Sequence, residues 1–209
     1  MSDISVRKAV VGPIMTNCYI VSSDERTGEA VIVDPGDSGD RIADFLRGEE
    51  IRPAAILLTH GHYDHILGVN DLVSAFPGTK ICIAESERRM VESPELNSGF
   101  YGGEYLISPD VWVRDGDVLP LIGREFRVIA TPGHTRGSVC YYLPDDEILF
   151  AGDTLFCGSY GRTDLPTGSE TELWKSLEML LTELPESVQV LPGHGEETTI
   201  GQEKRIEGF

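Results

Sequence analysis

The chain has 209 residues, of which 40% are apolar and 25% charged. This length suits one well-filled hydrophobic core, and the composition is ordinary for a globular domain, so we expect a single domain spanning residues 1–209. The formal net charge of −18 would repel phosphate backbones and anionic lipid headgroups, which disfavours nucleic-acid and membrane partners. No stretch is apolar enough to cross a bilayer, and residues 1–7 show no secretory signal.

The four cysteines are scattered along the chain and form no CxxC pair. Such a distribution indicates reduced, mostly buried thiols, as in cytosolic proteins, so we expect a cytoplasmic location. Cys157 has no spare histidine to activate it and is interpreted as a small buried residue. The sequence leaves the oligomeric state open.

The first part of the chain alternates strands with a helix. Short runs rich in Val and Ile predict strands at 4–11, 18–21 and 30–33. Apolar residues at helical spacing predict a helix over 39–49. A continuous apolar run then predicts a strand at 54–58 that is buried on both faces.

The middle of the chain continues this alternation. A helix is predicted over 66–76, where a Pro-Gly pair ends it, followed by a strand at 80–84. A second helix is predicted over 85–92, and a loop carries residues 97–103.

The second half returns to strands around one strong helix, whose leucines form a stripe. Two groups of strands, each joined to helices, favour a layered α/β or α+β domain with two sheets face to face and helices outside. The strands are predicted at 111–113, 126–130, 139–143, 148–150 and 188–191, the helix at 170–184, and a short helix near Gln202.

All five histidines occupy turns at predicted strand ends. The segment 59–65, Thr-His-Gly-His-Tyr-Asp-His, directly follows the strand at 54–58 and holds three imidazoles and one carboxylate. Loops that leave strand ends are common places for functional sites. Imidazole and carboxylate suit Zn, Fe or Mn better than Ca or Mg, so this segment predicts a transition-metal site.

The same arrangement recurs at three later strand ends. Short glycine-containing turns follow the predicted strands and carry His134, Asp153 and His194. Glycine lets the backbone bend sharply and approach an ion. One histidine after a strand is usually a structural residue, but five at such turns beside two aspartates are seldom incidental.

The number of donors indicates a binuclear centre. Seven N and O ligands are too many for one tetrahedral ion and suit two ions that share a carboxylate. The candidate ligands are His60, His62, Asp64, His65, His134, Asp153 and His194.

These motifs resemble those of the metallo-β-lactamase superfamily. Within it, the segments 155–169 and 198–204 are similar to the short bacterial proteins of the glyoxalase II (hydroxyacylglutathione hydrolase) type. The superfamily motifs are THGHYDH at 59–65, PGHT at 132–135, GDT at 152–154 and PGHG at 192–195.

The resemblance implies a four-layer αββα sandwich with two divalent metal ions at one edge, zinc first and iron or manganese as alternatives. It implies hydrolysis of a small thioester of the hydroxyacyl-glutathione type by a metal-bridging hydroxide, with Asp64 and Asp153 catalytic. A thiolate leaves readily and needs little general-acid help. In the ligand division that the resemblance implies, metal one would be held by His60, His62 and His134. Metal two would be held by Asp64, His65 and His194, and Asp153 would bridge the two ions.

The resemblance also suggests a substrate contact. In glyoxalase II a lysine near the position of Arg162 meets the glutathione moiety, and a guanidinium could bind a carboxylate in the same way. An ion pair between Arg162 and Asp164 is the alternative interpretation, and both remain open. Tyr160 flanks the site, whereas Tyr63 is expected to point away from its ligand neighbours.

Other activities remain open on the same scaffold. A persulfide dioxygenase would use one iron held by His60, His134 and Asp153. A lactonase or another esterase, and a non-catalytic metal-binding scaffold, are further alternatives. A β-lactamase is disfavoured by the bridging Asp153, and a nuclease by the acidic charge. The chain also departs from full-length glyoxalase II, because we expect no C-terminal glutathione-binding helical domain.

Overall fold

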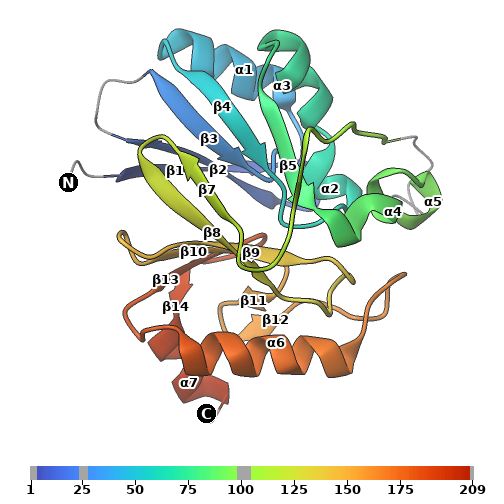
Figure 1. Cartoon of the computed structure of the whole chain (residues 1–209), viewed down its shortest axis with the longest axis vertical. Coiled ribbons are helices and arrows are strands. Elements are labelled where there is room, and N and C mark those ends of the chain that lie inside the picture. Colours follow the sequence, from blue (N-terminus) through green and yellow to red (C-terminus); the bar gives the residue numbers. More distant parts are fainter. Residues whose placement is uncertain (1–3, 24–27, 98–104, 208–209) are drawn as a thin grey trace.

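Two six-stranded sheets form the inner layers of the molecule (Figure 1). The structure is a computed structural model, and it describes residues 4–23, 28–97 and 105–207. Helices α1 (Gly39–Gly48) and α3 (Val69–Ala75) lie outside the first sheet, and α6 (Glu170–Glu183) and α7 (Ile200–Glu207) lie outside the second. This arrangement confirms the predicted four-layer αββα sandwich.

The first sheet has the strand order β1-β2-β3-β4-β5-β6. Its first three strands are antiparallel and its last four are parallel. Leu46 and Leu72 from the two outer helices pack on Ile32 and Ile56 of the sheet. The strands are β1 (Ile4–Val11), β2 (Thr16–Ser23), β3 (Glu29–Val33), β4 (Arg52–Leu57), β5 (Lys80–Ala84) and β6 (Val111–Val113).

The second sheet has the order β14-β13-β10-β9-β8-β7, and only its β10–β13 pair is parallel. The leucine stripe of α6 covers its outer face, with Leu173 and Leu177 buried against Leu149. The strands are β7 (Val118–Leu121), β8 (Arg124–Ala130), β9 (Val139–Leu143), β10 (Ile148–Gly152), β13 (Gln189–Pro192) and β14 (Thr198–Thr199).

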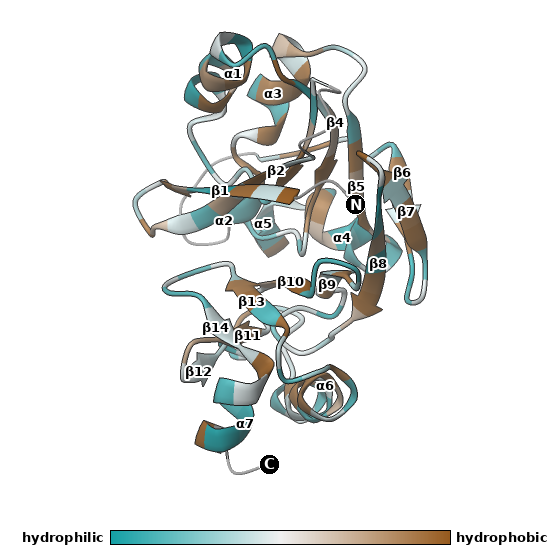
Figure 2. Cartoon of the chain, turned by 90° about the vertical axis from the view of Figure 1, so that its left-hand side faces the viewer, coloured by the Kyte–Doolittle hydropathy of each residue, from teal (hydrophilic) through white to brown (hydrophobic). Residues whose placement is uncertain are grey.

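The main core lies between the two sheets. Alternate strand residues face it, among them Val31 and Leu57 from the first sheet and Phe126 and Phe150 from the second. In Figure 2, strand β10 and the end of β8 are hydrophobic, whereas the outer helices carry hydrophilic segments. Because both sheets are anchored in this core, the loops at their shared edge start from rigid positions.

Short elements complete the chain at the edge of the sandwich. The predicted helix over 66–76 is wrong in its bounds, because Gly68 packs closely on Pro35 and Gly39 and separates two short helices. The short elements are α2 (Tyr63–Ile66), the 3-10 turn η1 (Glu85–Glu87), α4 (Arg88–Val91), α5 (Pro94–Asn97), β11 (Leu155–Phe156) and β12 (Ser159–Tyr160).

Other differences from the sequence prediction concern small or edge features. Strands β7, β11, β12 and β14 were not predicted, since short edge strands show weak alternation. The predicted helix over 85–92 is a 3-10 turn followed by α4. Of the loop expected over 97–103, Asn97 ends α5 and the rest lies outside the described residues.

The cysteine prediction was correct for three of the four thiols. Cys18, Cys82 and Cys140 are buried, but Cys157 is exposed, which corrects its assignment as a buried residue. Burial raises the pKa of Cys82 and Cys140 to about 11. No helix in the described part of the chain has the length and apolarity needed to cross a bilayer.

Candidate metal centre

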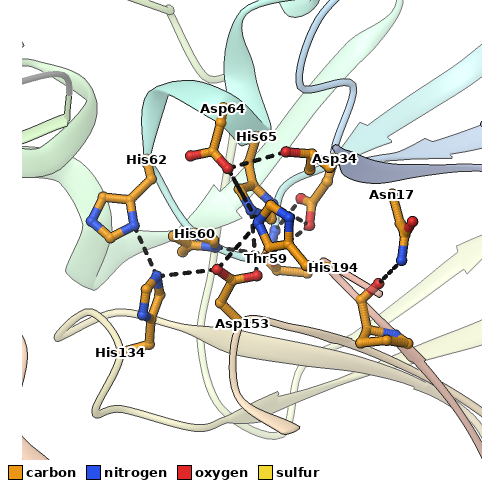
Figure 3. A network of polar contacts seen from close by, with 12 residues as sticks. Asn17, Asp34, Thr59, His60, His62, Asp64, His65, His134, Asp153 and His194 are labelled. Carbon is orange, nitrogen blue, oxygen red and sulfur yellow. Dashed lines mark hydrogen bonds and ion pairs between the residues drawn. The ribbon is translucent and has the colours of Figure 1, made fainter. Parts of the chain in front are cut away.

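Four strand ends deliver the candidate ligands to one edge of the sandwich (Figure 3). The loop after β4 and the short helix α2 carry the cluster at 59–65. The turns after β8 and β13 carry His134 and His194, and the last residue of β10 precedes Asp153. The structure therefore brings together residues that lie far apart in the sequence.

Asp153 lies at the middle of this cluster. Its Oδ2 is 3.5 Å from Nε2 of His134 and 3.5 Å from Nε2 of His194, and its Oδ1 is 3.4 Å from Nε2 of His65. In each of three overlapping groups the donor atoms lie within 4.8 Å of one another. The groups are His60–His62–His134, His60–His65–Asp153 and Asp64–His65–His194.

Several of the converging atoms have no hydrogen-bond partner. Within the described ranges, Nε2 of His60 and His65 and Oδ1 of Asp153 are buried without a hydrogen-bond partner, and Nδ1 of His62 faces Nε2 of His134 at 2.9 Å. A buried polar atom without a partner is costly, and lone pairs that converge on one point satisfy each other poorly. A divalent metal ion would satisfy them, and the N and O donor set suits such an ion.

The pKa shifts within the cluster favour the protonation states in which these side chains can bind a metal ion. Burial lowers the pKa of His62 to about 3, with help from neighbouring His134, and burial also keeps the pKa of His60 well below its usual range. Both imidazoles are therefore neutral and can donate a lone pair. Burial alone would raise the pKa of Asp153, but His65 outweighs it and keeps this carboxylate ionised.

His65 has the opposite shift. Burial opposes its protonation, but the carboxylates of Asp64, Asp153 and Asp34 together raise the pKa of His65 well above its usual value. Binding of a cation at Nε2 would displace this proton, since a metal ligand must be neutral imidazole. Metal uptake here should therefore release a proton.

Asp34 is a residue of the candidate site that the sequence analysis missed. It is buried, and its Oδ1 accepts a hydrogen bond from the backbone N of Thr59 at 2.8 Å. Its Oδ2 accepts one from Thr59 Oγ1 at 2.6 Å and lies 2.9 Å from His65 Nδ1. Such a carboxylate orients the ring so that Nε2 faces the centre. The signal was available, because Asp34 follows β3 and precedes Pro-Gly.

The hairpin of β1 and β2 supports the His194 turn. Asn17 donates from Nδ2 to the carbonyl oxygens of Pro192 and Gly195, each at 3.0 Å (Figure 3). Thr16 Oγ1 donates to Asp64 Oδ2 at 3.1 Å. A Cβ at Gly193 would collide with Asp153, so the turn requires glycine. The first hairpin is thus part of the site, which sequence spacing did not indicate.

Glu87 joins the two loops that carry the other histidines. Its side chain is 1% exposed, and its two oxygens accept hydrogen bonds from the backbone N of Gly61 at 2.7 Å and of Gly137 at 2.9 Å. Burial raises the pKa of Glu87, and no Lys or Arg pairs with it among the described residues. Its polar contacts are therefore with the backbone of the two ligand loops and with the side chain of Thr135.

We expect Glu87→Gln to weaken metal binding at the His60–His62–His134 end by about ten- to a hundredfold, the range for residues that support ligands. Glutamine keeps one acceptor oxygen but places an NH₂ group against the other backbone N–H. Competition with a chromogenic chelator measures the effect. Glu85→Gln is the matched control, since Glu85 lies on the same turn but pairs with Arg114 at the surface. Unchanged affinity with a lower Tm would limit Glu87 to a role in folding.

A cavity of about 970 Å³ opens above the donor cluster. Tyr63 lines it and stacks on Tyr105, so the expectation that Tyr63 points away from the site is wrong. Its other lining side chains include the apolar Ile14, Leu96, Phe156, Leu165 and Pro166. A cavity with a polar floor and apolar walls is typical of small-molecule sites.

Arg162 lies at the rim of this cavity, and it is also ion-paired. Its Nε and Nη2 donate to the carboxylate of Asp164 at 2.7 and 2.8 Å, and both side chains are exposed. Nδ1 of His134 lies 2.7 Å from the carbonyl oxygen of Arg162, a contact that leaves Nε2 directed at the centre. The ion-pair interpretation is therefore correct, and substrate contact stays a prediction.

Curated relatives match nearly the whole chain. An uncharacterised protein of Aquifex aeolicus is 41% identical over 95% of this chain and 93% of its own length. A probable metallo-hydrolase of Bacillus subtilis, YqgX, is 38% identical over 93% and 92%. The hydroxyacylglutathione hydrolase GloC of Haemophilus influenzae is 34% identical over 92% of both chains.

Solved structures agree with this result. The BLEG-1 B3 metallo-beta-lactamase has a TM-score of 0.90 and 38% identity, over 96% of this chain and 97% of that one. TTHA1623, solved in a di-iron-bound form, has a TM-score of 0.85 and 34% identity, over 96% and 98%. ETHE1 from Myxococcus xanthus has a TM-score of 0.77 and 29% identity, over 96% and 82%.

A family model assigns the chain to a superfamily, and this assignment agrees with the similar proteins and with the donor cluster. The model of the Metallo-beta-lactamase superfamily matches residues 11–194, which contain every candidate ligand. Two relatives named as probable metallo-hydrolases cover 93% and 92% of this chain. The chain therefore belongs to the metallo-beta-lactamase superfamily and is a metal-dependent hydrolase of that superfamily.

Proposed function

We propose that this protein is a binuclear metal-dependent thioesterase that acts on hydroxyacyl-glutathione-like thioesters. The observation that carries the proposal is the set of imidazole and carboxylate donors grouped around Asp153 beneath an open cavity. The similarity to GloC supports the thioester class. Zinc is the first choice of metal, while iron and manganese also suit these donors, and TTHA1623 has a di-iron form.

The three donor groups support a specific division of ligands. Two of the groups match the two triads that the family resemblance implies, and the remaining one links them through Asp153. A central carboxylate that approaches histidines of both triads could be shared by two ions. We assign His60, His62 and His134 to one ion, Asp64, His65 and His194 to the other, and Asp153 to both.

Two divalent cations bound here would lower the pKa of a shared water toward neutrality and polarise the substrate carbonyl. The protein's own residues prepare the site for this chemistry. Thr16 fixes one oxygen of Asp64, so that the carboxylate can orient the attacking water. All five histidines belong to the cluster, which leaves no imidazole as a general acid. A thiolate leaving group needs none.

A substrate panel on metal-replete protein tests the proposal. We expect turnover of a hydroxyacyl-glutathione thioester to exceed that of an acyl-homoserine lactone, and no oxygen uptake with glutathione persulfide. Oxygen uptake by iron-loaded protein would instead support the dioxygenase. Zero turnover of every substrate would support a non-catalytic scaffold. A β-lactam belongs in the panel as the second candidate, because of the similarity to BLEG-1.

Arg162 provides a test of the thiol carrier. We expect Arg162→Ala to raise KM for a glutathione thioester by about two- to fivefold, because an exposed ion pair with a substrate carboxylate is weak. A thioester without peptide carboxylates should show no such change. Asp164→Asn is the matched control, since it frees the guanidinium and should lower KM for the glutathione thioester. Equal losses on both substrates would mean that Arg162 supports the fold.

A further inference from the structure

His134 and His194 lie on opposite sides of Asp153 (Figure 3), and all three residues line the cavity, which therefore has two ends. At one end, the contact between His134 Nδ1 and the carbonyl oxygen of Arg162 places the Arg162 segment beside metal ligand His134. At the other end, the ring of Phe156 lies 6.2 Å from the ring of His194. The two ends are therefore built by different segments of the chain.

Ile14 belongs to the His194 end. Ile14 lies two residues before Thr16. Thr16 forms a β-bridge with His194 and donates a hydrogen bond to Asp64. Ile14 and Phe156 both line the cavity. The hairpin tip that presents Ile14 is thereby attached to the metal centre itself, and Ile14 keeps a defined position relative to the ligands.

The two ends differ in chemistry. Besides the candidate ligands, the charged side chains that line the cavity in the described part of the chain are Glu95, Arg162 and Asp164. None of them comes from the hairpin tip or from β11, which supply the apolar Ile14 and Phe156. The His194 end thus has the apolar Ile14 and Phe156, with Ser159 paired to Phe156, whereas the Arg162 end carries charge.

The tip of the β1–β2 hairpin exposes two apolar side chains, and one of these residues has a strained backbone conformation. Ile14 is 39% exposed and its neighbour Met15 is 65% exposed. Met15 also has a positive φ of 60°, a conformation that residues other than glycine seldom adopt. An exposed apolar side chain, Ile14, which lines the cavity next to this strained residue, supports a binding role.

We propose that the His194 end is a subsite for an apolar acyl chain, contacted by Ile14 and Phe156, while the thiol carrier lies at the Arg162 end. This inference rests on the proposed thioesterase function and extends its substrates from short hydroxyacyl groups to longer acyl chains. In the reaction one water supplies the oxygen of the new C–O bond and the C–S bond breaks. The products are a carboxylate and a thiol, so no other reactant is needed.

A series of acetyl, butanoyl, hexanoyl and octanoyl thioesters of one carrier tests the subsite on metal-replete protein. We expect kcat/KM of the wild type to rise by about fourfold for each of the first buried methylenes. Ile14→Ser should lower the ratio of octanoyl to acetyl kcat/KM by about fivefold or more. Val10→Ser is the matched control, because Val10 is exposed on the same hairpin but does not line the cavity.

Binding of the product carboxylates separates this inference from the proposed function. Calorimetry should show that octanoate binds metal-replete wild type more tightly than acetate, and that Ile14→Ser removes most of the difference. Chain-length selection in binding without thioester turnover would retain the subsite and overturn the thioesterase. Thioester turnover with equal octanoate and acetate binding, or with the same selection in Ile14→Ser, would overturn the subsite.

Discussion

Asp153→Ala is expected to lower kcat/KM by about a thousandfold or more while leaving the protein folded. Asp153 is the only donor that approaches His134, His194 and His65 at once among the described residues. Its loss removes the bridge between the two ions and the orientation of the attacking water, and such metal-based stabilisation is worth several kcal/mol. Steady-state kinetics with metal analysis and circular dichroism measure the outcome.

Two further variants make the result specific. Asp153→Asn keeps the size of the side chain but removes its charge, and it should lose metal nearly as completely. His134→Ala should release one ion and retain the other, because Asp64, His65 and His194 form a separate donor group. Near-native turnover of Asp153→Ala with full metal content would refute the assigned bridge, as would loss of both ions from His134→Ala.

Removing the metal ions with a chelator is expected to abolish activity and to lower Tm without unfolding the protein at room temperature. Activity is lost because no other group in the cluster can activate water. The fold persists because the ligands lie at strand ends, outside the core between the sheets. Tm falls because ions that bind only the native state stabilise it by mass action.

Circular dichroism before and after chelation distinguishes this behaviour from that of a metal-dependent fold, such as a zinc finger. Adding zinc, iron or manganese back to separate samples should restore activity to different extents and identify the most active metal. Loss of the far-ultraviolet signal on chelation would contradict the prediction. So would activity that survives complete removal of metal.

The amino-acid sequence by itself identified the candidate ligands and most of the strands. Each candidate ligand lies in a short turn that is recognised from neighbouring residues, such as Thr-Pro-Gly directly before His134. Strands buried on both faces, such as β4 and β5, appear as continuous apolar runs. These features depend on neighbours along the chain, so a pattern of a few residues suffices to predict them.

Only the tertiary structure decided how the ligands are supported and what surrounds them. Asn17 and Pro192 are 175 positions apart in the sequence, and Glu87 contacts loops that precede and follow it by many residues. The placement of Ile14 beside His194 likewise follows from the bridge at Thr16. Such contacts form when two sheets pack face to face, and no local periodicity encodes which distant segments then meet.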